Sequence, residues 1–205
     1  MLPVLERITG LGVPVSVDTS KPELMREAVS AGASMINDIL GLRAAGALPA
    51  LAAGDAAVCI MHMQGEPRTM QAQPVYRDVV REIREFLLER AREARAAGIA
   101  AQRIVIDPGF GFGKTTEHNL TLIRSLGKLA AEGYPVLAGL SRKSLFGKIV
   151  GRAVAERMPA SVAGALLAVQ RGASIVRVHD VAATRDALLV MRAVENGSVE
   201  TDEKL

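Results

Sequence analysis

Short apolar runs alternate along the chain with longer segments in which apolar residues recur every three or four positions. The apolar runs are residues 13–17, 34–36, 57–61, 104–106, 136–140 and 174–178. Their side chains are almost continuously apolar and do not alternate with polar ones. Such runs are typical of parallel strands buried on both faces, so we expect a parallel sheet.

The segments between these runs predict helices, at residues 22–31, 44–53, 75–97, 117–131, 159–171 and 183–196. The third has a one-sided apolar stripe of Val79, Ile83, Phe86 and Leu87. Glycines follow most of these segments, where helices commonly end. Residues 2–8 resemble the end of a further helix. Strands that alternate with helices indicate an α/β fold.

Two α/β architectures fit the pattern, an open doubly wound sheet and a (β/α) barrel. A complete eight-unit barrel takes about 250 residues. The chain has 205 residues and six strand–helix units. The barrel interpretation therefore expects about six of eight units in residues 1–196, with the first two missing, followed by a polar tail at 197–205.

Polar residues that can do chemistry follow all six apolar runs, and this distribution favours the barrel. They are Asp18, Asn37, His62, Asp107, the Ser-Arg-Lys-Ser segment 141–144, and His179 with Asp180. In a barrel the carboxyl ends of all strands surround one mouth. An open sheet would instead concentrate such residues at one switch point. We therefore predict a (β/α)8 TIM barrel.

The segment Ile-Asp-Pro-Gly-Phe-Gly-Phe-Gly-Lys-Thr at 106–115 is similar to a phosphate-binding loop but fails its template. Pro108 occupies the place of the first required glycine and has no N–H to offer a phosphate. The glycines at 109, 111 and 113 alternate, so the dinucleotide pattern fails too. Asp107 then becomes the residue of interest, unless Asp-Pro-Gly is simply a turn.

Composition excludes several classes of function. Aromatic residues are 3% of the chain and Trp is absent, which argues against stacking surfaces for single-stranded nucleic acid. The net charge of +3 is mild. Cys59 lies in an apolar run, so we expect a buried, unreactive thiol. No signal pattern and no apolar run of ~18 residues is present. We expect a cytoplasmic protein without nucleic-acid or membrane partners.

Six motifs, in this order, resemble dihydropteroate synthase over residues 13–196. They are VSVDTSKPE, INDI, MHMQGEP, IDPGFGFGK, GLSRKS and RVHDV. Each is weak alone, but six in register are specific. The resemblance implies a (β/α)8 barrel, usually a homodimer, assisted by Mg²⁺. Such an enzyme joins 4-aminobenzoate to the methylene carbon of 6-hydroxymethyl-7,8-dihydropterin diphosphate, which yields dihydropteroate and diphosphate.

The chemistry of a pterin agrees with the residue types at these positions. Its N3–H and 2-amino groups form a donor pair that a carboxylate accepts bidentately, and Asp107 is the candidate acceptor. The resemblance implies that Asn37 and Asp18 contact the remaining polar edge of the ring. For Asp18, the alternative is a cap for the helix that begins at Pro22.

The remaining candidates come from the last two strand ends. The resemblance implies that Lys143 contacts the pterin and lies near the aminobenzoate, with Ser144, and also Ser141 and Arg142, on that side. Arg177 and His179 can grip a diphosphate, so we count Lys143, Arg177 and His179 as catalytic. We expect no protein nucleophile, since diphosphate leaves readily. His62 is predicted to be a satisfied strand-end residue and not a catalyst.

The chain departs from the family at one point. The family's first strand ends in an Asn-Val-Thr-Pro-Asp-Ser segment whose asparagine helps to hold magnesium and diphosphate, and the 205 residues contain no such segment. We therefore name no metal ligand and expect the main one in a missing N-terminal segment. We also expect weak or no synthase activity from this chain alone, unless a partner completes the barrel.

Three other functions remain open from the sequence. The pterin-binding module of corrinoid-dependent methyltransferases shares the barrel and the Asp–Asn arrangement, but would need neither Ser-Arg-Lys-Ser nor the Arg177–His179 pair. The chain could instead be a non-catalytic pterin-binding protein that pairs with another subunit. A sugar-phosphate barrel enzyme fits less well, because the carboxylates and the amide suit a nitrogen heterocycle better than hydroxyl groups.

Overall fold

The structure is a computed structural model that describes residues 1–65, 69–70 and 74–198. Within these residues all paired strands are parallel and follow one another in chain order. β1 to β4 form one ladder, a bridge from Ile106 to Val136 continues it, and β5 pairs with β6. The strands are β1 (Ser16–Asp18), β2 (Met35–Asp38), β3 (Ala57–Met61), β4 (Ile104–Asp107), β5 (Leu137–Ala138) and β6 (Ile175–Val176).

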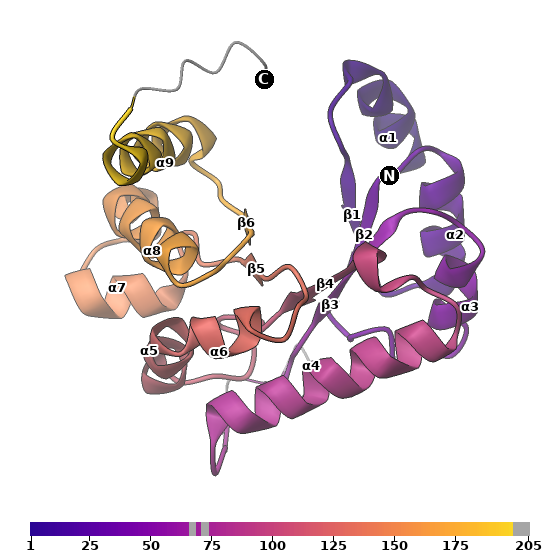
Figure 1. Cartoon of the computed structure of the whole chain (residues 1–205), viewed down its shortest axis with the longest axis horizontal. Helices are drawn as coiled ribbons and strands as arrows, with labels where there is room; N and C mark the ends of the chain where they lie inside the picture. Colours follow the sequence, from indigo (N-terminus) through magenta and orange to yellow (C-terminus); the bar gives the residue numbers. More distant parts are fainter. Residues whose placement is uncertain (66–68, 71–73, 199–205) are drawn as a thin grey trace.

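The helices cover the outside of this row of strands (Figure 1). They are α1 (Leu2–Ile8), α2 (Pro22–Ser30), α3 (Ala47–Ala52), α4 (Val79–Ala96), α5 (Thr116–Arg124), α6 (Leu126–Ala130), α7 (Ser144–Val150), α8 (Met158–Gln170) and α9 (Val181–Asn196). Short 3-10 turns lie at η1 (Thr9–Leu11), η2 (Ala101–Arg103) and η3 (Val154–Glu156). In the described residues, none of these helices is long and apolar enough to cross a membrane.

The strand order decides between the two predicted architectures. A doubly wound sheet reverses its order at a switch point, whereas here sequential strands are neighbours throughout. The strands curve into an arc with its helices outside, which is the arrangement of a (β/α) barrel (Figure 1). The described residues contain no pairing between β1 and β6, so the arc is open between them.

A small apolar cluster fills the inner side of the arc. Cys59, Val105 and Leu137 are its buried members, with Met35 and Ile175 packed against them. The prediction of a buried cysteine is confirmed, and burial raises the pKa of its thiol. The larger apolar cluster includes Leu5, Ile83, Leu87 and Ile106.

Several predicted boundaries were wrong, each for a local reason. The helix expected at 75–97 begins at Val79, because the Asp78 carboxylate accepts hydrogen bonds from the N–H groups of Val80 and Arg81. The helix expected at 117–131 divides at Ser125, whose ψ of 12° interrupts it. The strand expected at 13–17 is paired only from Ser16.

Other differences concern the second half of the chain and its end. The strands expected at 136–140 and 174–178 have two paired residues each, although Arg177 N still donates to Ala138 O at 3.1 Å. Helix α7 was not predicted. Of the polar tail expected at 197–205, residues 199–205 lie outside the described part. Glu66 and Pro67 of the motif MHMQGEP lie outside it too.

Candidate functional site

The inner apolar cluster is the floor of a polar site at the carboxyl ends of the strands. Side chains two positions apart in a strand face the same way. Asn37 follows Met35, Asp107 follows Val105, and Arg177 follows Ile175 at this spacing. These polar residues therefore lie above the apolar floor. Asp18 reaches the same rim from the end of β1.

Arg177 joins the two carboxylates of this site. Its Nη1 lies 3.8 Å from Asp18 Oδ2, and its Nη2 lies 3.6 Å from Asp107 Oδ2. Asn37 Nδ2 donates to Asp18 Oδ2 at 2.9 Å. The structure thus brings together Asp18, Asn37 and Asp107, although strands far apart in sequence carry them. Asp18 does not cap helix α2, because no side chain accepts a capping hydrogen bond at the start of that helix, whose N-cap residue is Lys21.

Two buried oxygen atoms in this group accept no hydrogen bond from the described residues. They are Oδ2 of Asp107, a residue only 1% exposed, and Oδ1 of Asn37. The other oxygen of Asp107 accepts from Gly109 N at 2.7 Å. Burial raises the pKa of Asp107, while the charge of Arg177 opposes that change. Because buried acceptors are costly without donors, these two oxygens favour a ligand that offers N–H groups.

The loop after β4 explains why its glycines alternate. Gly109, Gly111 and Gly113 all have positive φ, at 67°, 79° and 60°. A Cβ at Gly109 would lie 1.9 Å from the His62 carbonyl oxygen, and one at Gly113 would lie 2.4 Å from that of Gln64. The loop therefore packs against the backbone after β3, which only glycine permits.

Lys143 enters the site from the loop after β5. Its Nζ donates to the Phe110 carbonyl and lies 4.6 Å from the centre of the Phe112 ring. Burial lowers the pKa of Lys143 to about 8, and the negative charge of Asp107 opposes this. The glycine loop and Lys143 thus form one wall of the site. Ser144, at the start of α7, is exposed.

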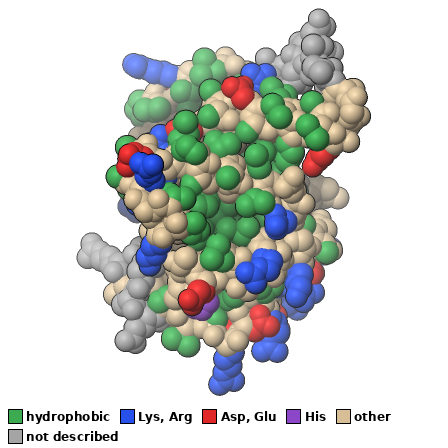
Figure 2. Space-filling view, turned by 90° about the vertical axis from the view of Figure 1, so that its left-hand side faces the viewer, with side chains coloured by type: hydrophobic (Ala, Val, Ile, Leu, Met, Phe, Trp, Pro, Cys, Tyr) green, Lys and Arg blue, Asp and Glu red, His purple; other side chains and the backbone are tan. Residues whose placement is uncertain are grey.

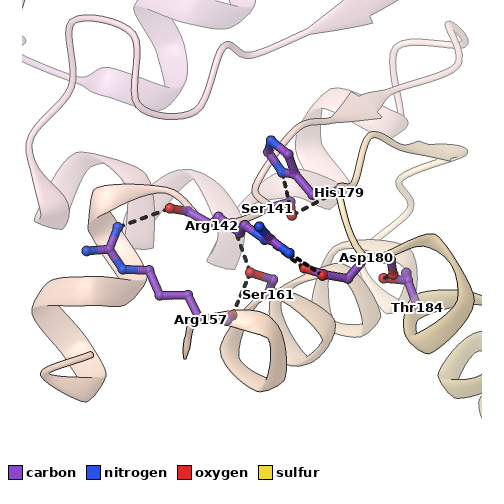
Figure 3. A network of polar contacts seen from close by, with 7 residues as sticks. All are labelled: Ser141, Arg142, Arg157, Ser161, His179, Asp180 and Thr184. Carbon is purple, nitrogen blue, oxygen red and sulfur yellow. Dashed lines mark hydrogen bonds and ion pairs between the residues drawn. The ribbon is translucent and has the colours of Figure 1, made fainter. Parts of the chain in front are cut away.

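A polar network locks the loop after β5 to the loop after β6 (Figure 3). The Arg142 guanidinium binds both oxygens of Asp180, with Nε to Oδ2 at 3.0 Å. Arg142 N donates to Ser161 Oγ at 2.9 Å, and Arg157 Nη1 donates to Arg142 O at 3.1 Å. The side chain and backbone of Arg142 therefore both hold the loop. The backbone of this residue has an unusual positive φ of 56°.

His179 belongs to this network and is separate from Arg177. Its N–H donates to Ser141 Oγ at 3.1 Å, and its Nδ1 lies 3.0 Å from the same hydroxyl oxygen (Figure 3). The predicted pairing of Arg177 with His179 as an anion clamp stays a prediction. Among the described residues, Arg177 faces two carboxylates, and its side chain remains 40% exposed.

His62 has the character of a buried structural residue. Its Nδ1 lies 3.1 Å from Nζ of Lys114, and its ring packs edge-on against the ring of Phe86. Burial, and then the charge of Lys114, lower its pKa to about 3. A histidine held neutral and enclosed in this way fits the predicted structural role and not proton transfer.

The residues present do not fit a magnesium site of their own. In the part of the chain that the structure describes, no group of three or more His, Cys, Asp or Glu side chains could hold a metal ion. The carboxylates of Asp18 and Asp107 both face the Arg177 cation. The predicted magnesium, with its main ligand outside these residues, stays a prediction.

Three residues that shape the site were not identified from the sequence. Gly139 lies beside the Arg177 guanidinium, and a glycine inside an apolar strand run could have signalled such a close approach. Asn119 accepts from Gly111 N at 2.8 Å and donates to Thr115 O at 2.6 Å. The pattern of its helical segment contains no signal that would identify Asn119 as a residue of the site. Lys114 is the third and is buried beneath the loop.

Known proteins are similar to this chain over most of its length. A family model described as pterin binding enzyme matches residues 1–179. The dihydropteroate synthase of Neisseria meningitidis serogroup C is 52% identical over 196 residues, which cover 94% of this chain and 69% of that protein. A dihydropteroate synthase structure from Stenotrophomonas maltophilia, with imidazole in its active site, has a TM-score of 0.93 and 56% identity, covering 98% of this chain and 76% of that one.

A third comparison concerns a structure with a larger ligand. The Burkholderia cenocepacia dihydropteroate synthase complexed with 7,8-dihydropteroate has a TM-score of 0.91 and 52% identity. The match covers 96% of this chain and 73% of that one.

Proposed function

The chain belongs to the dihydropteroate synthase family of pterin-binding enzymes, and we propose that its strand-end site condenses a dihydropterin diphosphate with 4-aminobenzoate. The products are dihydropteroate and diphosphate. The observation that carries this proposal is that two buried acceptors, Asp107 Oδ2 and Asn37 Oδ1, accept no hydrogen bond from the described residues. A pterin offers adjacent N–H donors that both oxygens could accept.

In the proposed complex, Asp107 binds the N3–H and 2-amino edge of the pterin. Lys143 Nζ, with its pKa lowered to about 8, is a hydrogen-bond donor to the ring carbonyl or a ring nitrogen. Asn37 and Asp18 complete the polar edge. The glycines at 109 and 113 let the loop pack against the backbone after β3, and a Cβ at Gly111 would lie 3.1 Å from the Lys143 side chain.

The reaction needs positioning and charge stabilisation instead of a protein nucleophile. The bond from the pterin methylene carbon to the diphosphate oxygen breaks, and the electron pair leaves with diphosphate. The amine nitrogen of 4-aminobenzoate then bonds to that carbon and loses a proton to solvent. The carboxylates of Asp18 and Asp107 stabilise positive charge that develops on the pterin. Arg177 and His179 are proposed to receive the departing anion.

Two further features belong to the proposal. Exposed apolar side chains lie on α8 and α9; they are Leu167, Val181, Val190 and Val194. Figure 2 views the left-hand side of Figure 1, where these two helices lie, and shows apolar side chains gathered on that face. We propose that a second copy of the chain covers this face, as a homodimer. The open side between β1 and β6 leaves the site incompletely enclosed, so we expect the chain alone to turn over slowly. The cytoplasmic location and the lack of nucleic-acid partners stay predictions.

The test combines binding with turnover. Titration of the wild-type chain with 6-carboxypterin measures pterin binding, and pteroate formation measures the reaction. We expect Asp107→Asn to weaken pterin binding by about 10- to 100-fold, because a charge-assisted acceptor is lost. Asp55→Asn, at an exposed position, is the matched control.

The two arms separate this function from the alternatives. Wild-type affinity and rate in Asp107→Asn would refute the assignment of the pterin site. Inhibition by diphosphate would favour a synthase, whereas pterin binding without any effect of diphosphate would favour a methyltransferase-type module. Pterin binding without pteroate formation, even with the homodimer present, would favour a non-catalytic binding protein.

A further inference from the structure

Lys114, the lysine of the Gly-Lys-Thr sequence, lies beneath the site. The residue is 3% exposed. Its Nζ donates to the carbonyl oxygens of Gly109 and Phe112, both at 2.9 Å. It also lies 3.1 Å from Nδ1 of His62 and 3.4 Å from the His62 carbonyl oxygen. The lysine of the segment that resembles a phosphate loop is therefore enclosed by backbone and imidazole acceptors.

An ammonium group buried in this way needs all its protons satisfied. Lys has three donors, and the carbonyls of Gly109 and Phe112 with Nδ1 of His62 supply three acceptors. Burial lowers the pKa of Lys114 to about 7, with the charge of Asp107 opposing. His62 can accept because its own pKa, about 3, leaves the ring neutral. A lysine held here at such cost in desolvation indicates a specific geometric role.

The contacts of Lys114 lead directly to the pterin carboxylate. Gly109 uses its carbonyl to accept from Lys114, and its N–H donates to Asp107 Oδ1. The other oxygen, Asp107 Oδ2, lies 3.6 Å from Arg177 Nη2 and accepts no hydrogen bond from the described residues. Lys114 is therefore linked to the Asp107 carboxylate through Gly109, and the two side chains share no hydrogen bond within the described residues.

The same lysine also supports the wall of the site that the glycine loop forms with Lys143. It binds the carbonyl of Phe112, whose ring lies under the Lys143 ammonium. Lys143 in turn donates to the Phe110 carbonyl of the same loop. Both polar groups proposed to hold the pterin, Asp107 and Lys143, thus depend on the loop conformation that Lys114 maintains.

We infer that Lys114 is a positioning residue for pterin binding: it fixes the Gly109–Phe112 loop and so aims Oδ2 of Asp107 at the ligand. This inference rests on the proposed function of the site. A purely structural anchor would affect the stability of the fold alone. A positioning residue also changes the affinity of the folded protein for the pterin.

The experiment compares Lys114→Met with Lys128→Met, a substitution of an exposed lysine on α6. Methionine has similar length and no donors. Affinity for 6-carboxypterin is measured by titration at pH 6, where the wild-type ammonium is charged, and folding by circular dichroism. We expect Lys114→Met to weaken binding at least about tenfold in folded protein, and Lys128→Met to change it by less than about twofold. Lys114→Arg, which keeps charge and donors, should restore part of the affinity.

Each outcome decides the matter. If the wild-type chain itself binds no pterin, the proposed function fails first, and this inference with it. If the wild type binds and folded Lys114→Met binds equally well, the inference alone is overturned. If neither Lys114→Met nor Lys114→Arg folds, Lys114 is a structural anchor and the inference is again overturned.

Discussion

Gly139 makes room for the guanidinium of Arg177. A Cβ at Gly139 would lie 3.1 Å from Arg177 Nη2 and 3.3 Å from Nε, which is tighter than ordinary contact. Arg177 is also the cation that bridges Asp18 and Asp107. A residue without any functional group therefore determines where the central charge of the site can lie.

This contact predicts the effect of Gly139→Ala. The added methyl group should displace Arg177 and reduce affinity for inorganic diphosphate by about tenfold, because the guanidinium no longer faces the mouth. Calorimetric titration with diphosphate measures the change. Gly127→Ala is the control, since its Cβ would meet nothing closer than 3.7 Å. Equal diphosphate affinity in both variants would show that Arg177 tolerates the methyl group or does not bind the anion.

The Arg142–Asp180 pair predicts coupling between two loops. Removing either charge, in Arg142→Gln or Asp180→Asn, should release the loop that carries Lys143 and lower pteroate formation by about tenfold. The double variant should lose little more than either single one, because both remove the same contact. Fully additive losses in this cycle would argue against the coupling. Ser161→Ala, which removes the acceptor for Arg142 N and the hydroxyl that donates to Arg157 O, tests the same loop from its other side.

Lys114 predicts a particular dependence of stability on pH. Its pKa is about 7 in the folded chain and 10.5 without burial. Between these values the unfolded chain holds a proton that the folded chain has lost, so the free energy of unfolding rises with pH. Lys143, with a pKa of about 8, adds to the upper part of the rise.

Denaturant unfolding from pH 6.5 to 9.5 measures this dependence. We expect the rise to be smaller in Lys114→Met than in the wild type, while Lys128→Met follows the wild type. The range stops below pH 10 because Tyr76, whose pKa burial raises, would bring in a change of opposite sign. A rise of the same size in all three proteins would contradict a buried, partly neutral Lys114.

The apolar face on α8 and α9 predicts self-association. Val190 and Val194 are 65% and 77% exposed, and a charge at either position would be buried against a second copy. We expect Val190→Asp to shift the chain from dimer to monomer in light scattering. Val4→Asp, on the exposed surface of α1, should leave the association unchanged. A wild-type chain that is monomeric at high concentration would remove the basis of this prediction.

Much of the fold and the chemical character of the site could be predicted from the chain. Strand directions and apolar runs depend on local pattern, and parallel strands place their carboxyl ends together, so Asp18, Asn37 and Asp107 were identified as neighbours. The first and last residues of some helices were not predicted correctly. Capping at Asp78 and the break at Ser125 depend on single hydrogen bonds and dihedral angles that periodicity does not contain.

The sequence by itself determined which residue types face the mouth, because hydrophobic period and strand polarity act over a few neighbouring positions. Only the tertiary structure decided that Arg177 lies between two carboxylates, that Gly139 leaves space for it, and that Lys114 is enclosed below Gly109. These relationships are distances across the arc, between residues that are up to 159 positions apart in the case of Asp18 and Arg177 (177 − 18 = 159). Packing sets such distances, and no local pattern along the chain encodes them.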